Sequence, residues 1–102
     1  MTRDQAIATL RAHQAELRAA GVESLSIFGS VARGDATAAS DIEVIVRLAP
    51  GAHQGGFAYF GYLDDLTRRL AQILGRPVDV VTAPVHRDRL RQNIDREATL
   101  AF

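Results

Sequence analysis

Acidic side chains of two predicted strands are the residues of this sequence best suited to chemistry. Asp41 and Glu43 lie two positions apart in a stretch that alternates polar and apolar residues, which favours a strand with both carboxylates on one face. Asp79 lies in a second short segment of β-branched residues. Carboxylates held side by side repel, and a hard divalent cation such as Mg²⁺ relieves that repulsion while accepting phosphate oxygens. We therefore predict Asp41, Glu43 and Asp79 as metal ligands and catalytic residues, if their strands pair as neighbours.

A glycine–serine turn that precedes these acids is suited to holding an anion. Gly29 and Ser30 follow a short β-type segment and open a stretch of one or two helical turns. Glycine permits a close backbone approach to phosphate, and a helix start offers free N–H groups. Arg33 is placed either to reach a phosphate oxygen or to pair with Asp35. We predict Gly29, Ser30 and Arg33 as nucleotide-binding residues. The whole set is equipment for phosphoryl or nucleotidyl transfer, in which a carboxylate accepts the proton of an attacking hydroxyl.

Alternating helices and strands must position these residues. Periodicity predicts strands over 24–28, 41–47 and 78–81, and loops over 35–40 and 48–56. It also predicts helices, whose ranges are 2–20, 57–74 and about 87–97, while the tail 99–102 reads as a last short strand or a docking segment. Thr2 and Gln5 form a candidate capping box for the first helix. This order indicates an α/β fold with a small sheet covered by helices, and leaves parallel or mixed pairing open.

The apolar positions of these helices predict the core. The first helix carries Ile7, Leu10 and Leu17 on one face. The long helix keeps one apolar stripe, which consists of Phe60, Leu63, Leu66, Leu70 and Ile73. Its aromatic start, 57–62, is typical of core packing and is also compatible with a protein interface. The Arg87, Arg89 and Arg91 run is expected to be a solvated helix face, and Arg47 to balance the acidic charge.

Bulk properties narrow the class of protein. The 102 residues fit one domain, 1–102, and the small core leaves room for homo- or hetero-oligomers. Net charge is zero, which gives no argument for binding nucleic acid or an anionic membrane. Without cysteine, a membrane-length apolar run or a signal-peptide core, the chain is expected in the cytoplasm. His13, His53 and His86 fit no metal-ligand spacing.

The chemistry-bearing residues resemble the nucleotidyltransferase superfamily of the DNA polymerase β type. Its pattern is Gly-Ser, ten residues, then Asp-x-Asp or Asp-x-Glu, with a third acid on a later strand. Here ten residues separate Ser30 from the Asp41-Ile42-Glu43 motif, and Asp79 takes the place of the third acid. Arg33-Gly34, Ser40 and the closing segment 94–98 also match, so the resemblance covers nearly the whole chain. Its smallest branch, the minimal nucleotidyltransferase (MNT) antitoxins, is the most similar.

The resemblance implies a fold, a reaction and a partner. The fold is α/β (α+β), with a small mixed sheet flanked by helices. MNT antitoxins act on HEPN toxins, which are RNases, and some transfer AMP from ATP to a toxin tyrosine. The resemblance thus implies Mg²⁺, ATP as substrate and a HEPN partner. The antitoxin branch usually carries Asp where this chain has Glu43, so a binding-only antitoxin that occludes its toxin is the alternative. A small-molecule nucleotidyltransferase of the aminoglycoside type is disfavoured, since those enzymes usually carry a further helical domain.

Overall fold

Four strands form one mixed sheet in the order β3-β2-β1-β4. The computed structural model describes residues 1–51 and 57–102, and in it the strands are β1 Val22–Phe28, β2 Ile42–Leu48, β3 Val78–Thr82 and β4 Thr99–Leu100. β1 runs antiparallel to both β2 and β4, whereas β2 and β3 are parallel. The predicted strands are confirmed, with ends shifted by one or two residues. The predicted fold class, a small mixed sheet flanked by helices, is also confirmed.

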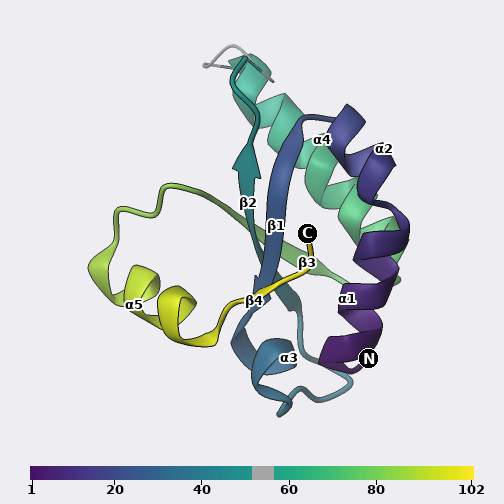
Figure 1. The fold of residues 1–102 in the computed structure, drawn as a ribbon, viewed down its shortest axis with the longest axis vertical. Helices are drawn as coiled ribbons and strands as arrows, with labels where there is room; N and C mark the ends of the chain where they lie inside the picture. Colours follow the sequence, from purple (N-terminus) through teal and green to yellow (C-terminus); the bar gives the residue numbers. More distant parts are fainter. Residues whose placement is uncertain (52–56) are drawn as a thin grey trace.

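Helices are distributed unequally over the two faces of this sheet. They are α1 Arg3–Ala12, α2 Gln14–Ala19, α3 Gly29–Arg33, α4 Phe57–Leu74 and α5 Asp88–Glu97. Figure 1 shows α1, α2 and α4 gathered on one side of the strands, while α5 stands apart on the other side and α3 lies at the end of β1. The first face is therefore covered, and the second is covered only in part.

The hydrophobic core lies between the sheet and the covering helices. Ile42, Val44 and Val46 of β2 are completely buried, which confirms the predicted alternation. From α4, Leu66, Leu70 and Leu74 join the same cluster. The prediction that Phe60 belongs to this stripe is wrong, because its side chain is 68% exposed. Its neighbour Tyr59 is directed to the sheet instead, with its hydroxyl 3.0 Å from Thr82 Oγ1 at the end of β3.

The predicted helix over 2–20 is two helices that meet at His13. The capping box is present, since Gln5 N–H donates to Thr2 Oγ1 and Thr2 N–H donates to Gln5 Oε1. His13 has a ψ of 14°, away from the helical value, and it ends α1 and caps α2. Both halves still bury their apolar face, so the predicted core positions Ile7, Leu10 and Leu17 are confirmed.

The C-terminal segment is both a short strand and a docked tail. After β4, Ala101 N–H donates to Leu25 C=O at 2.9 Å, and Leu25 N–H donates to Phe102 C=O at 2.9 Å. Arg11 Nε donates to Ala101 C=O at 2.7 Å, which ties α1 to this tail. Ala101 is only 1% exposed. The end of α5 is therefore anchored to the edge of the sheet.

Two further expectations concern the chain outside the sheet. His53 and most of the predicted loop 48–56 lie outside the described residues. Arg87, Arg89 and Arg91 are exposed, as predicted for a solvated helix face. Across residues 1–51 and 57–102, no helix is long and apolar enough to cross a membrane.

The core location of α4 predicts a sharp contrast between two leucines. Leu70→Ala should lower the free energy of unfolding by about 2–5 kcal/mol, because it removes a fully buried side chain and leaves a cavity. Leu100→Ala makes the same change at a side chain that is 59% exposed, and should cost less than about 1 kcal/mol. Urea unfolding of both variants tests this, and equal losses would contradict the described core.

Candidate active site

Parallel pairing of β2 and β3 brings two of the predicted acids together. Glu43 and Asp79 are direct partners in the register of these strands, just as Ile42 and Val78 are. Since Ile42 and Val44 point into the core, Glu43 faces the opposite, less covered side of the sheet. On its other side Glu43 is paired with Phe28, the last residue of β1. The neighbouring placement that the sequence analysis required for Asp79 is therefore present.

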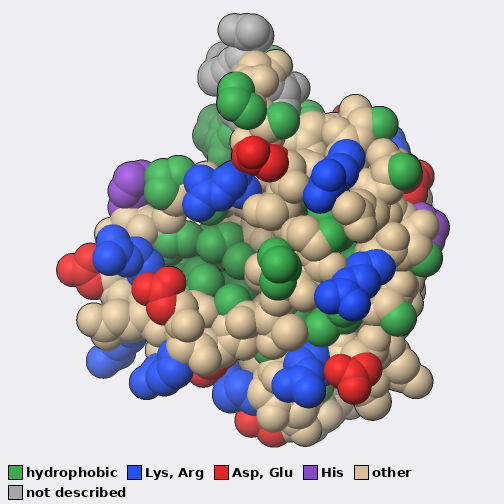
Figure 2. Space-filling model, viewed as in Figure 1, with side chains coloured by type: hydrophobic (Ala, Val, Ile, Leu, Met, Phe, Trp, Pro, Cys, Tyr) green, Lys and Arg blue, Asp and Glu red, His purple; other side chains and the backbone are tan. Residues whose placement is uncertain are grey.

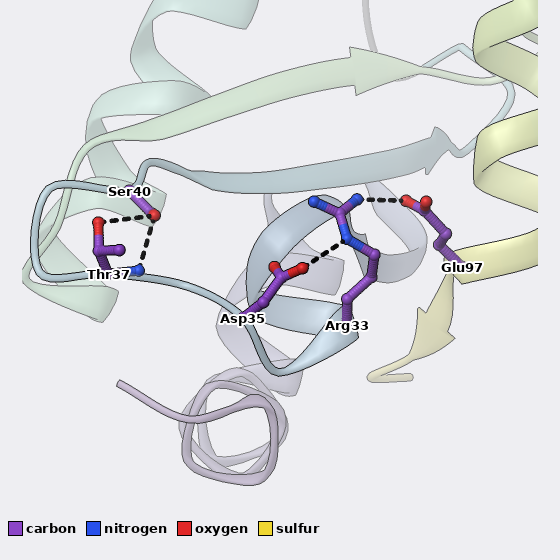
Figure 3. Close-up of polar contacts among 5 residues, drawn as sticks. All are labelled: Arg33, Asp35, Thr37, Ser40 and Glu97. Carbon is purple, nitrogen blue, oxygen red and sulfur yellow. Dashed lines mark hydrogen bonds and ion pairs between the residues drawn. The ribbon is translucent and has the colours of Figure 1, made fainter.

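Asp41, the third predicted acid, stands just before β2 rather than inside it. Its side chain is exposed, and the strand begins at Ile42, whose N–H donates to Pro77 C=O at 2.9 Å. The preceding loop is braced from within, because Ser40 Oγ accepts from Thr37 N–H at 2.9 Å (Figure 3). Asp41 therefore lies directly before the first residue pair of β2 and β3.

Arg76 fixes the loop that carries Asp41. Its Nη2 donates to the carbonyl oxygens of Ala38 and Ser40, both at 2.8 Å, and approaches that of Thr37 at 3.2 Å. Arg76 follows α4 and precedes β3, so this contact links the start of the Asp79 strand to the loop before Asp41. Sequence reasoning missed Arg76, because nothing in local spacing relates it to carbonyl groups more than 30 residues away.

Gly29 makes room for the carboxylate of Glu43. Its φ is +76°, a region in which side chains are strained. A Cβ placed on Gly29 would lie 2.7 Å from Glu43 Cδ and closer still to Oε2. The predicted reason for this glycine was close phosphate approach. The structure gives it a different role, which is to leave room for the carboxylate of Glu43 against the bend. Binding of phosphate at Gly29 and Ser30 stays a prediction.

The electrostatics of Glu43 reflect this crowded position. Partial burial raises the pKa of Glu43 above its ordinary value, and the negative charge of Asp79 raises it further. Arg33 acts in the opposite direction, whereas Glu97 and Asp41 add to the rise. Four charged neighbours from four different segments therefore act on one carboxylate. Such a carboxylate gains from a cation that offsets its neighbours.

Arg33, predicted to contact phosphate, is held by two carboxylates. Its Nε donates to Asp35 Oδ2 at 3.2 Å and its Nη1 donates to Glu97 Oε2 at 3.0 Å (Figure 3). The hydrogen bond with Asp35 is the main cause that raises the pKa of Arg33. The surface pair with Asp35 that the sequence suggested is thus present. Glu97 was missed, since 64 residues separate it from Arg33 and only the fold brings α5 to α3.

The acids fit a divalent metal by their chemistry, although they are not gathered as a ready-made site. Carboxylate oxygens are the ligands that Mg²⁺ prefers, and the repulsion around Glu43 is what a cation would offset. Within the described residues, no group of three or more His, Cys, Asp or Glu side chains is arranged to hold a metal ion. Metal binding by Asp41, Glu43 and Asp79 therefore stays a prediction.

A hollow lies on the same face of the sheet as Glu43. It has a volume of about 330 Å³, and it lies between the strands and α5. Ile45 and Ile94 contribute apolar lining, while Arg47 and Asp95 are its charged members. Figure 2 shows hydrophobic side chains on the floor of this hollow, with charged groups around it. Because Ile45 is two residues beyond Glu43 on β2, the hollow continues the face that carries the acids.

Family comparison agrees with this arrangement. The model of the nucleotidyltransferase domain family matches residues 10–100, which include every predicted site residue. The chain belongs to the nucleotidyltransferase family. A candidate protein adenylyltransferase of Methanocaldococcus jannaschii is 31% identical over 77 residues, which cover 74% of this chain and 73% of that relative.

Solved structures share the nucleotidyltransferase fold. A candidate minimal nucleotidyltransferase superimposes with a TM-score of 0.74 at 29% identity, covering 97% of this chain and 95% of its own. A complex of a tri-AMPylated HEPN toxin of Shewanella oneidensis with its MNT antitoxin superimposes with a TM-score of 0.58. Its identity is 19%, and the match covers 90% of this chain and 68% of that chain. At this identity, the second likeness shows the fold alone.

The contact between Gly29 and Glu43 can be measured with two matched glycines. Gly34→Ala meets open space at a φ of +82° and should cost about 1–2 kcal/mol of unfolding free energy from backbone strain alone. Gly29→Ala carries similar strain and must also displace Glu43, so it should cost about 1–3 kcal/mol more. Equal losses in chemical denaturation would show that Glu43 does not pack against the bend.

The raised pKa of Glu43 predicts a dependence of stability on pH. The folded chain holds the Glu43 proton more tightly than the unfolded chain, so stability is lost as pH rises from about 4.5 through the raised pKa. Glu43→Gln removes this loss and should raise the melting temperature at pH 7, with the gain shrinking below pH 4.5. Glu23→Gln, at an exposed position near the start of β1, is the matched control. A lower melting temperature of the Glu43→Gln variant at pH 7 would contradict this account.

Proposed function

We propose that this nucleotidyltransferase transfers AMP from ATP to a partner protein of the HEPN class, with Mg²⁺ held by Asp41, Glu43 and Asp79. The observation that carries the proposal is the packing of Glu43 against Gly29 with Asp79 as its register partner. That arrangement joins the acid pair to the glycine–serine bend in one place. The family, and the candidate adenylyltransferase among its relatives, support the choice of reaction.

Each residue of the site has a role in this transfer. Bound Mg²⁺ supplies positive charge that offsets the triphosphate and the three carboxylates. Ser30 and Arg33 bind phosphate oxygens through the hydroxyl and the guanidinium. Asp79 orients the acceptor hydroxyl and takes its proton as the hydroxyl oxygen attacks the α-phosphorus. The bond from that phosphorus to the β-phosphate oxygen breaks, and pyrophosphate leaves. The products are a nucleotidylated protein and pyrophosphate.

A protein acceptor suits the open side of the sheet. The hollow between α5 and the strands offers room on the face that carries Glu43, and helices cover this face only in part. A partner would therefore complete the acceptor site and form a hetero-oligomer with this chain. The HEPN class is supported by the complex of an AMPylated HEPN toxin with its antitoxin, whose MNT chain shares this fold.

A second function, neutralisation of the toxin by binding alone, is favoured by one feature. The longer Glu43 side chain already occupies the space above Gly29, and the described acids are not gathered around a metal position. In this alternative the site is vestigial and occlusion is sufficient. The two functions differ in whether the acids are needed for neutralisation.

Transfer assays separate these functions. The chain, labelled ATP, Mg²⁺ and a HEPN protein are incubated, and the mass of the HEPN protein is measured. Asp41→Asn and Asp79→Asn should each lower the rate at least about 100-fold, because each removes a carboxylate charge from the reacting centre. Asp64→Asn, at an exposed ion pair of α4, is the control and should leave the rate unchanged.

The position of Glu43 gives a further comparison in the same assay. Glu43→Asp shortens the second acid and opens space above Gly29. A rate equal to or above that of the wild type supports transfer with a tolerant metal position. If neither form modifies the HEPN protein, while Asp41→Asn still neutralises it, transfer is excluded and binding alone explains the function.

A further inference from the structure

Arg33 forms ion pairs with two carboxylates that differ in exposure and in distance along the sequence. Asp35 follows it by two residues and is 60% exposed, so it is a local surface partner. Glu97 is the last residue of α5, and its side chain is only 15% exposed, whereas the side chain of Arg33 is 45% exposed. A long-range, largely buried carboxylate is less screened by water and loses less side-chain freedom than an exposed one. Glu97 therefore adds a long-range constraint on the guanidinium to the local pair with Asp35.

These two ion pairs leave some N–H donors of the guanidinium available for another acceptor. Arg33 uses Nε for Asp35 and one N–H of Nη1 for Glu97, and a guanidinium carries more donors than these. Within residues 1–51 and 57–102, its Nη2 has no hydrogen-bond or ion-pair partner. Figure 3 shows Nη2 pointing away from Glu97. The guanidinium is thus fixed through Nε and Nη1, while Nη2 can still donate to a phosphate oxygen.

Glu97 also has a fixed position of its own. α5 contacts α3, and directly after Glu97 the chain enters β4 and the docked tail. The backbone of Glu97 is therefore tied to the edge of β1. A carboxylate anchored in this way transmits the position of α5 to Arg33.

We propose that Glu97 is a positioning residue for nucleotide binding, which holds Arg33 with its free donors directed to the phosphates of ATP and so couples α5 to the nucleotide site. This inference rests on the proposed function, since it requires that ATP binds. In this role Glu97 contacts no substrate, and its effect on ATP binding passes through Arg33. A partner protein that displaces α5 would thereby change the affinity for ATP.

The opposite effect is also physically possible and makes the test decisive. A carboxylate near a triphosphate repels it and competes for the same guanidinium. If competition prevailed, removal of Glu97 would strengthen ATP binding. The two accounts therefore differ in the sign of a single measurement.

Calorimetric titration of the whole chain with ATP and Mg²⁺ tests the proposal through a double-mutant cycle. Glu97→Ala should weaken binding about tenfold, the equivalent of one charge-assisted hydrogen bond. Arg33→Ala should weaken it at least as much, and Glu97→Ala added to Arg33→Ala should have no further effect. Glu97→Gln keeps an oxygen acceptor in place and should fall between the wild type and Glu97→Ala. Asp64→Ala, which breaks an exposed ion pair on α4, is the control and should bind like the wild type.

Several results would overturn the inference. Glu97→Ala with unchanged or tighter binding would show that Glu97 is idle or competes with phosphate. The same loss with and without Arg33 would show a general effect on the fold, and thermal melts of each variant would locate it. Wild-type protein that binds no ATP would refute the proposed function as well. Wild-type binding with an unaffected Glu97→Ala variant would refute this inference alone.

Discussion

The packing of Glu43 against Gly29, beside Asp79, is the constraint on which the site depends. It is unfavourable taken alone, because partial burial and neighbouring carboxylates raise the pKa of Glu43. The opposite face of the same strand holds it in place. Ile42, Val44 and Val46 are fully buried, and a shift of one residue would expose them all. Burial of these residues therefore fixes the register that keeps Glu43 beside Asp79, although the placement of Glu43 itself lowers stability.

Arginine side chains fix the loops around Glu43. Arg76 gathers the carbonyl groups of the loop before Asp41, and Arg33 joins the loop after α3 to the end of α5. Both contacts join segments that are far apart in the sequence. Rigid placement of catalytic groups needs such outer support, since loops alone hold them too loosely. In this chain much of that support comes from the guanidinium groups of Arg33 and Arg76.

Helices cover the two faces of the sheet unequally, so the two faces differ in access. Three helices close one face around the core, whereas α5 leaves a hollow of about 330 Å³ on the face of the acids. A nucleotidyltransferase needs an open approach for both nucleotide and acceptor. The same incomplete cover that limits the core leaves the face that carries Glu43 accessible beside α5.

Local pattern in the sequence was sufficient for most of the elements and for the family. Alternation in 42–46 predicted the buried face of β2, and the spacing from Ser30 to Asp41 predicted the family. Such features depend on neighbours along the chain. Long-range relations needed the fold: that β2 and β3 run parallel with Glu43 opposite Asp79, that Gly29 accommodates an acid, and that Glu97 reaches Arg33. The exposure of Phe60 and the break at His13 belong to the same group, because they depend on what packs against each helix. Tertiary packing alone decides these, since nothing within a helical turn or a strand records the distance to a partner segment.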